Sequence, residues 1–123
     1  VDRMDFAHSS RYLEWFEIGR TEFLRAMGFP YRNLEEEGVF LPVVEAHVEY
    51  IRPIRYDDRV RIRTRGSIRG ARVRMDYELV RDGEVVARGY TVHACLNRKR
   101  RPMRPPKALR DAFEKAEGGK DVG

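Results

Sequence analysis

Residues 12–27 read YLEWFEIGRTEFLRAM, and apolar side chains recur in this segment at every third or fourth position. This spacing predicts an α-helix with a single apolar stripe. The stripe consists of Tyr12, Trp15, Phe16, Gly19, Phe23, Ala26 and Met27. Ser9 or Ser10 can cap the start of the helix, and Gly28 can end it. Because a glycine inside a helix costs about 1 kcal/mol, Gly19 predicts close packing of the helix against a sheet.

The chain after residue 38 alternates between apolar and polar side chains, which is typical of strands. Four segments show this alternation: VFLPVVEAHVEYI (39–51), RVRIRTR (59–65), ARVRMDYEL (71–79) and EVVARGYTVHACLN (84–97). Asp82-Gly83 predicts a tight hairpin turn. Short helices are expected at 31–37 and at 107–117. One apolar helix stripe and one apolar sheet face can bury each other, so we expect a single two-layer α+β domain over 1–117, with 118–123 as a flexible tail.

Composition narrows the class of protein. A chain of 123 residues with 41% hydrophobic and 37% charged residues is typical of one soluble globular domain. It has no apolar run long enough for a membrane span, and its first residues do not show the basic and apolar pattern of a secretory signal. Its single cysteine, Cys95, suits a reducing cytoplasm. The net charge of +5 comes mostly from arginine, whose guanidinium binds phosphates and carboxylates. A solvated, ion-paired surface is the alternative interpretation of most arginines.

Two separated motifs resemble a known family. The first comprises Asp2, Met4 and His8, followed by YLEWFEIGR (12–20); the second is VEYIRPIRYDD (48–58). In this order they resemble the hotdog-fold acyl-CoA thioesterases of the 4-hydroxybenzoyl-CoA thioesterase type. GFPY (28–31) and Gly89 fit as well, so that the likeness covers nearly the whole chain. The resemblance implies a hotdog fold, an antiparallel sheet wrapped around one long central helix.

The resemblance also implies a catalytic site ahead of the long helix. Thioester hydrolysis needs a carboxylate beside the carbonyl carbon and hydrogen-bond donors for the oxygen that becomes negative. Asp2 occupies the family's acid position and would act as nucleophile or as general base. Free backbone N–H groups near Ser9 and Ser10 would bind the oxyanion. His8 could orient the substrate or water, and an exposed acid is the alternative interpretation of Asp2.

Coenzyme A is part of the expected substrate, and no separate cofactor is expected. Its phosphates suit arginine, and the expected substrate-binding residues are Arg69, Arg72, Arg98 and Tyr12. No Cys/His spacing indicates a metal site; His47 and His93 lie in predicted strands and are interpreted as structural. The family pairs its domains edge to edge, which implies a homodimer or homotetramer with the site between subunits.

Two other functions remain open. The family has glycine at the position of Asp5 and histidine or tyrosine at the position of Ser9, so a non-catalytic acyl-thioester-binding protein is one alternative. A basic nucleic-acid-binding domain is the other, but no recognition-helix signature supports it. The acyl group, the choice between coenzyme A and an acyl-carrier protein as its carrier, and the choice between nucleophile and general base are not predicted.

Overall fold

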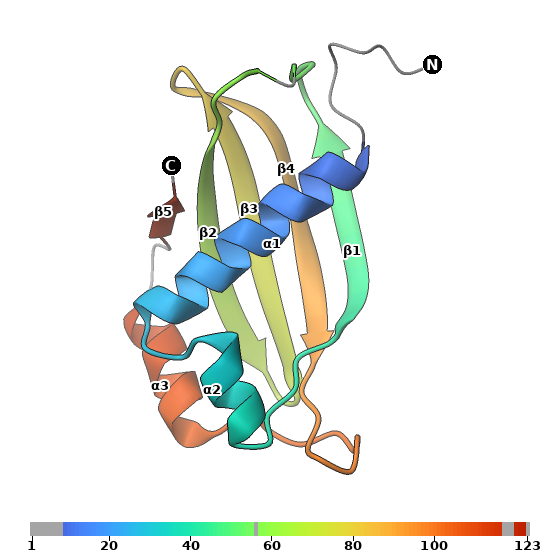
Figure 1. Cartoon of the computed structure of the whole chain (residues 1–123), viewed down its shortest axis with the longest axis vertical. Coiled ribbons are helices and arrows are strands. Elements are labelled where there is room, and N and C mark those ends of the chain that lie inside the picture. The colour runs from blue at the N-terminus through green and yellow to red at the C-terminus, as the bar shows by residue number, and fades with distance from the viewer. Residues whose placement is uncertain (1–8, 56, 117–119, 123) are drawn as a thin grey trace.

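The computed structural model describes residues 9–55, 57–116 and 120–122, which form one layer of helix on one sheet (Figure 1). In chain order the elements are α1 (Ser9–Ala26), α2 (Tyr31–Glu36), β1 (Val43–Tyr50), β2 (Arg61–Arg69), β3 (Arg72–Arg81), β4 (Glu84–Ala94), α3 (Lys107–Lys115) and β5 (Lys120–Val122). The expected α+β hotdog architecture is therefore confirmed. The helix starts earlier than the apolar repeat, so that Ser10 lies inside α1 rather than capping it.

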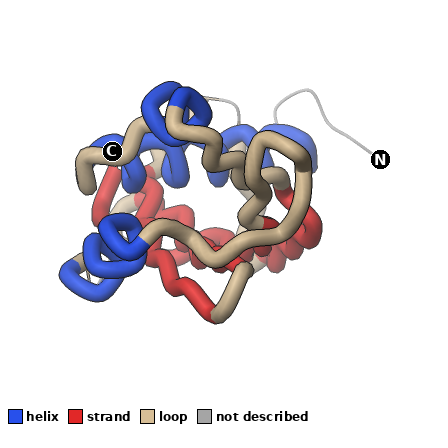
Figure 2. The backbone as a smooth tube through the Cα atoms, turned by 90° about the horizontal axis from the view of Figure 1, so that it is seen from below, coloured by secondary structure: helices blue, strands red, loops and turns tan. Residues whose placement is uncertain are grey.

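The strands form one antiparallel sheet in the order β1-β4-β3-β2-β5. The predicted hairpin joins β3 to β4, where Asp82 and Gly83 have φ of 52° and 79°. These left-handed angles are the ones that a tight two-residue hairpin turn requires. Seen from below, α1 and α2 lie along one side of the strands (Figure 2). The other side of the sheet therefore carries the polar side chains of each strand.

The apolar stripe of α1 packs on the central strands. Phe16 stacks on Tyr77 of β3 with ring centroids 4.4 Å apart. A Cβ at Gly19 would lie only 2.6 Å from Thr64 Oγ1 and 2.7 Å from Ile62 Cγ2. Ordinary contacts between such atoms are about 3.5–4 Å. The predicted role of Gly19 in close packing is confirmed, and the partner strand is β2.

The outer face of the sheet carries ion pairs both between strands and within β3. Arg88 of β4 lies 3.8 Å from Glu49 of β1, and Arg63 of β2 lies 3.5 Å from Glu78 of β3. Arg74 pairs with Asp76 at 3.0 Å and also covers the ring of Tyr90. These arginines therefore belong to an ion-paired, solvated surface, which was the alternative interpretation of most arginines in the sequence.

Two features differ from the sequence predictions. A strand was not expected beyond residue 117, yet β5 pairs with Ile62–Thr64 of β2. One apolar sheet face was expected to be buried by the helix, but in β1 Tyr50 and Val44, which lies at a β-bulge, are 54% and 49% exposed. β1 is an edge strand, and within the described residues α1 makes a ring contact with it through Tyr12 and Tyr50. The described residues of a single chain therefore leave most of its apolar face uncovered.

Candidate active site

The first turn of α1 offers hydrogen-bond donors. The first four N–H groups of any α-helix have no acceptor within the helix, and the helix dipole makes this end positive. No acidic side chain lies in the first turn of α1 to neutralise it. The turn is anchored by Tyr12, which is 4% exposed and meets Trp15 and Tyr50 edge to face at 5.5 and 4.8 Å. Rigid donors at this end suit a group that becomes negatively charged.

The expected catalytic residues fall at the limit of what the structure describes. Asp2 and His8 lie outside the described residues. Ser9 is the first residue of α1, and its side chain also lies outside the description. Their roles in catalysis therefore stay predictions.

Tyr12, the expected substrate-binding residue on α1, lies in the core. Burial, followed by the neighbouring Tyr50, raises the pKa of its phenol, so that the hydroxyl stays protonated at neutral pH. Its contacts with Trp15 and Tyr50 fix where α1 starts relative to the end of β1. Contact between Tyr12 and a substrate stays a prediction.

The expected phosphate-binding arginines gather at the opposite end of the molecule. Arg69 and Arg72 face each other across the β2–β3 turn, where Gly70 has φ of 59°. Both are exposed and line a surface pocket of about 480 Å³ with Arg74. This turn lies at the lower end in Figure 1, whereas α1 starts beside the upper end of β1. Within one protomer, these arginines therefore lie far from the start of α1.

Arg98 lies near this lower end and has a structural contact. Its Nη2 donates to the carbonyl oxygen of Glu36 at the end of α2, and its side chain lies against Gly38. It also lines a pocket of about 340 Å³ whose apolar wall consists of Phe40, Leu41, Pro42 and Leu96. The pocket therefore opens just before β1 begins, with a positive charge at its margin.

A buried polar chain crosses the core between α1 and the sheet. Arg20 donates from Nε to the Tyr31 hydroxyl at 2.6 Å and from Nη1 to the Tyr77 hydroxyl at 3.1 Å. Tyr77 lies 2.7 Å from Thr91 Oγ1, which lies 2.9 Å from His93 Nε2. Sequence reasoning did not predict this chain. The available signal was an arginine four positions after Phe16, on the side of the helix that packs.

The direction of every hydrogen bond in this polar chain can be assigned by starting from its last member, His93. His93 Nδ1 lies 2.9 Å from the Leu41 carbonyl oxygen, which can only accept, so Nδ1 carries a proton. Burial lowers the pKa of His93, so the ring is neutral and Nε2 accepts from Thr91. Thr91 in turn accepts from Tyr77, and Tyr77 accepts from Arg20. The interpretation of His93 as structural is supported by its burial and by both bonds.

Two other kinds of site are absent from the described part of the chain. Among its residues, no three His, Cys, Asp or Glu side chains are grouped so that they could hold a metal ion. None of the helices in that part is long and apolar enough to cross a membrane.

Three comparisons bear on the family. The family model described as the thioesterase-like superfamily matches residues 1–113. YneP of Bacillus subtilis, whose name describes it as a candidate acyl-CoA thioesterase, is 30% identical over 122 residues, covering 94% of this chain and 88% of that protein. The acyl-CoA thioesterase YbgC of Haemophilus influenzae is 30% identical over 116 residues, covering 92% and 85%.

A solved structure agrees with the sequence matches. The hypothetical protein TT1821 from Thermus thermophilus superposes with a TM-score of 0.85 at 33% identity, covering 94% of this chain and 89% of that one. The family model is that of the superfamily as a whole, so the narrower resemblance to the 4-hydroxybenzoyl-CoA type stays a prediction. The motifs ahead of and within α1, the single sheet and the matched length agree, and the chain belongs to the thioesterase-like superfamily.

Proposed function

We propose that this protein hydrolyses acyl-CoA thioesters to a free acid and coenzyme A. Water oxygen becomes bonded to the carbonyl carbon, the C–S bond breaks, and the leaving thiolate takes a proton. The relative YbgC is named an acyl-CoA thioesterase, and the family match supports the same reaction here. The observation that carries the proposal is the first turn of α1, whose N–H groups have no acceptor within the helix and whose own residues include no acidic side chain.

In this proposal Asp2 supplies the carboxylate. It either attacks the carbonyl carbon itself or takes a proton from the attacking water. The amides of Ser9 and Ser10 would hold the oxygen that becomes negative, and one such donor lowers the barrier by about 3 kcal/mol. His8 would orient the water or the thioester. No cofactor takes part, because coenzyme A enters as part of the substrate.

We further propose that two protomers share each site. In the described part of the chain, β1 is an edge strand with no further strand beside it and an exposed apolar face, which favours pairing with another strand. Two copies of β1 paired antiparallel would bring the end of one strand beside the start of the other. The start of α1 lies at the end of β1, and the pocket containing Arg98 lies just before β1 starts. One protomer would then supply the helix start and its partner the pocket.

Arginines at the lower end of the partner would hold the phosphates of coenzyme A. Arg69 and Arg72 present two guanidinium groups on one turn, and each can bind a phosphate bidentately. Arg98 stands beside the apolar pocket that would receive part of the ligand. The buried free thiol of Cys95 is consistent with a reducing cytoplasm, where we expect the protein to act.

Release of free thiol from a panel of acyl-CoAs tests this function. Asp2→Asn should abolish release while coenzyme A binding persists, because the amide can neither attack nor accept a proton. Asp111→Asn is the matched control, since Asp111 lies exposed on α3 and pairs only with Lys107 among the described residues. Equal turnover by wild type and Asp2→Asn would reject the catalytic role of Asp2. Acyl-CoA binding without any release would favour the non-catalytic alternative.

A further inference from the structure

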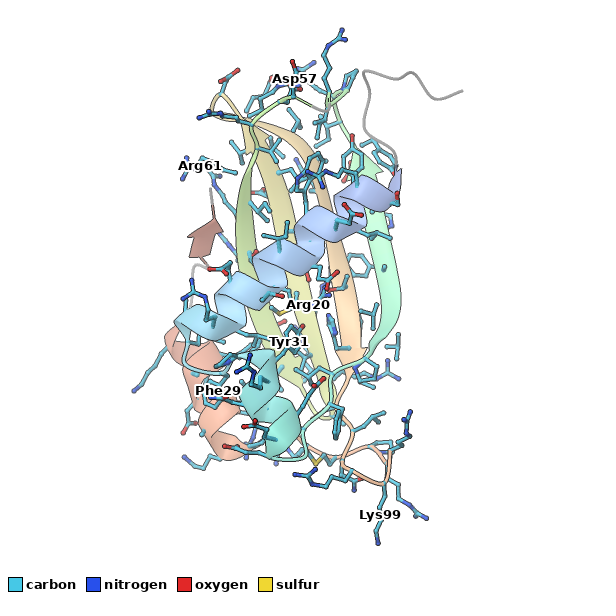
Figure 3. All side chains as sticks on the ribbon, viewed as in Figure 1. Arg20, Phe29, Tyr31, Asp57, Arg61 and Lys99 are labelled. Carbon is cyan, nitrogen blue, oxygen red and sulfur yellow. The ribbon has the colours of Figure 1, made fainter. Side chains whose placement is uncertain are left out.

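Arg20 is a half-buried cation without a carboxylate partner among the described residues. Figure 3 shows it reaching from α1 toward the strands, beside Tyr31 of α2. A guanidinium has five N–H groups, and two of them donate to the hydroxyls of Tyr31 and Tyr77. The other three have no acceptor among the residues that the structure describes. Three N–H groups of this cation are therefore available to a further acceptor.

Neither tyrosine supplies a negative charge at neutral pH. Burial raises the pKa of Tyr31 to about 12, and burial likewise raises that of Tyr77. Withdrawing a cation from water without an opposite charge is costly. An anion from outside this chain's described residues would relieve that cost and use the spare donors.

The inner face of β1 extends from the start of α1 toward the polar chain that holds Arg20. Tyr50 contacts Tyr12 at the start of α1, and Ala46 pairs with Thr91, which is linked to Arg20 through Tyr77. The inner side chains of β1 share the side of the sheet on which α1 lies, because Ala46 pairs with the buried Thr91 in the register. They form an apolar strip of Ala46, Val48 and Tyr50, of which Ala46 and Tyr50 are exposed. Arg20 is ten residues beyond Ser10, which is about 15 Å of helix, and its side chain leans back toward the helix start.

We infer that Arg20 binds a carboxylate at the far end of the acyl group, so that the enzyme prefers ω-carboxyacyl thioesters to plain alkanoyl thioesters. This inference rests on the proposed function. The thioester carbonyl would sit at the first turn of α1, the methylene groups would lie along the apolar strip of β1, and the carboxylate would meet the spare N–H groups. Arg20 is thus a specificity-determining residue rather than a member of the reacting group.

The buried chain behind Arg20 holds it in place. Because Tyr77 donates its proton to Thr91, its oxygen lone pair is left to face Arg20. Tyr31 holds Nε in the same way. A cation fixed by two neutral oxygens keeps its remaining donors aimed at one place, which lowers the entropy cost of binding an anion. Tyr31 and Tyr77 are therefore positioning residues.

The test compares kcat/KM for straight-chain ω-carboxyacyl-CoAs with that for alkanoyl-CoAs of equal carbon count, over a series of lengths. Wild type should prefer the ω-carboxyacyl member at the best length, by roughly 10- to 100-fold, as expected for a hydrogen-bonded charge pair. Arg20→Met should remove that preference, and Arg20→Lys should keep part of it because the charge remains. Arg32→Met is the matched control, since Arg32 is exposed on α2 next to Tyr31. It should leave the preference as in wild type.

Each result has a distinct meaning. Equal kcat/KM of wild type for both members of every pair overturns the inference but not the proposed function. A loss in Arg20→Met that is the same for both members also overturns it, because Arg20 then acts on the fold alone. A change in oligomeric state by light scattering, with the preference intact, would assign the missing anion to a second copy. If Arg20→Met does not fold, Arg20→Lys and Tyr31→Phe decide by the same ratio. No thiol release from any acyl-CoA overturns the proposed function, and the inference with it.

Discussion

Gly19 offers a sharp test of how α1 is seated on the sheet. In an exposed helix, glycine to alanine stabilises by about 1 kcal/mol, because alanine loses less backbone entropy. At Gly19 the new methyl group would meet Thr64 Oγ1 at 2.6 Å and Ile62 Cγ2 at 2.7 Å. Both distances are about 1 Å shorter than an ordinary contact. Gly19→Ala should therefore destabilise the protein although it favours the helix.

The magnitude follows from the surroundings of these two atoms. Thr64 and Ile62 are 0% and 4% exposed, so neither side chain can turn out into water. The helix has to retreat from β2, and overpacking of this kind costs about 3 kcal/mol at the upper end of the usual range. After the gain in helix propensity, the net loss is about 2 kcal/mol. For a domain of this size the melting temperature should fall by about 6 to 10 °C.

Thermal unfolding at a fixed protein concentration measures the effect, since an oligomer unfolds in a concentration-dependent way. Ile18→Ala is the control, because Ile18 precedes Gly19 and is 45% exposed. It should change the free energy of unfolding by no more than about 0.5 kcal/mol. Gly19→Ala combined with Thr64→Ala should recover part of the loss. A melting temperature of Gly19→Ala equal to or above that of wild type would refute the packing described for α1.

Three further outcomes are expected. Tyr77→Phe removes the hydroxyl that accepts from Arg20 Nη1 and donates to Thr91, so the free energy of unfolding in urea should fall by about 1–3 kcal/mol; an unchanged midpoint would contradict the buried chain. Since burial lowers the pKa of His93, the unfolded chain takes up a proton below about pH 6.5 that the folded one refuses, and stability should decrease as the pH falls below that value. His93→Asn keeps a donor for the Leu41 carbonyl oxygen and should flatten this slope in melts recorded against pH. Burial raises the pKa of the Cys95 thiol, which should react with a disulfide reagent only on unfolding; fast reaction of the native protein would show that Cys95 is accessible.

Local sequence patterns were sufficient to predict most of the fold. The three-and-four spacing after Tyr12 predicted α1, and the Asp82-Gly83 pair predicted the β3–β4 turn. Both depend on short-range chemistry that neighbouring residues determine. Gly19 was predictable for the same reason, since a glycine on the apolar stripe of a helix indicates that another element approaches closely there.

Features that depend on distant contacts were not predictable. β5 has only three residues and forms because β2 offers an edge, which no pattern within residues 120–122 reveals. The hydrogen-bonded chain from Arg20 to His93 joins residues that are far apart in sequence. An arginine on a helix usually indicates a position exposed to solvent, so the sequence did not point to a buried one. Alternation in β1 predicted the faces of residues 45–50. It predicted neither the bulge at Val44 nor the exposure of the inner face, because exposure depends on what covers the edge of the sheet.

The two edges of the sheet, at β1 and at β2 with β5, differ in how they allow protomers to associate. Beyond β2, the short β5 occupies the backbone of Ile62–Thr64, and Phe113 of α3 lies against Gly66. The border at β1 keeps its backbone groups and apolar side chains available. Strand addition at β1 can pair a full eight-residue edge, whereas among the described residues the far border offers only the three residues of β5, so two copies are expected to associate through β1.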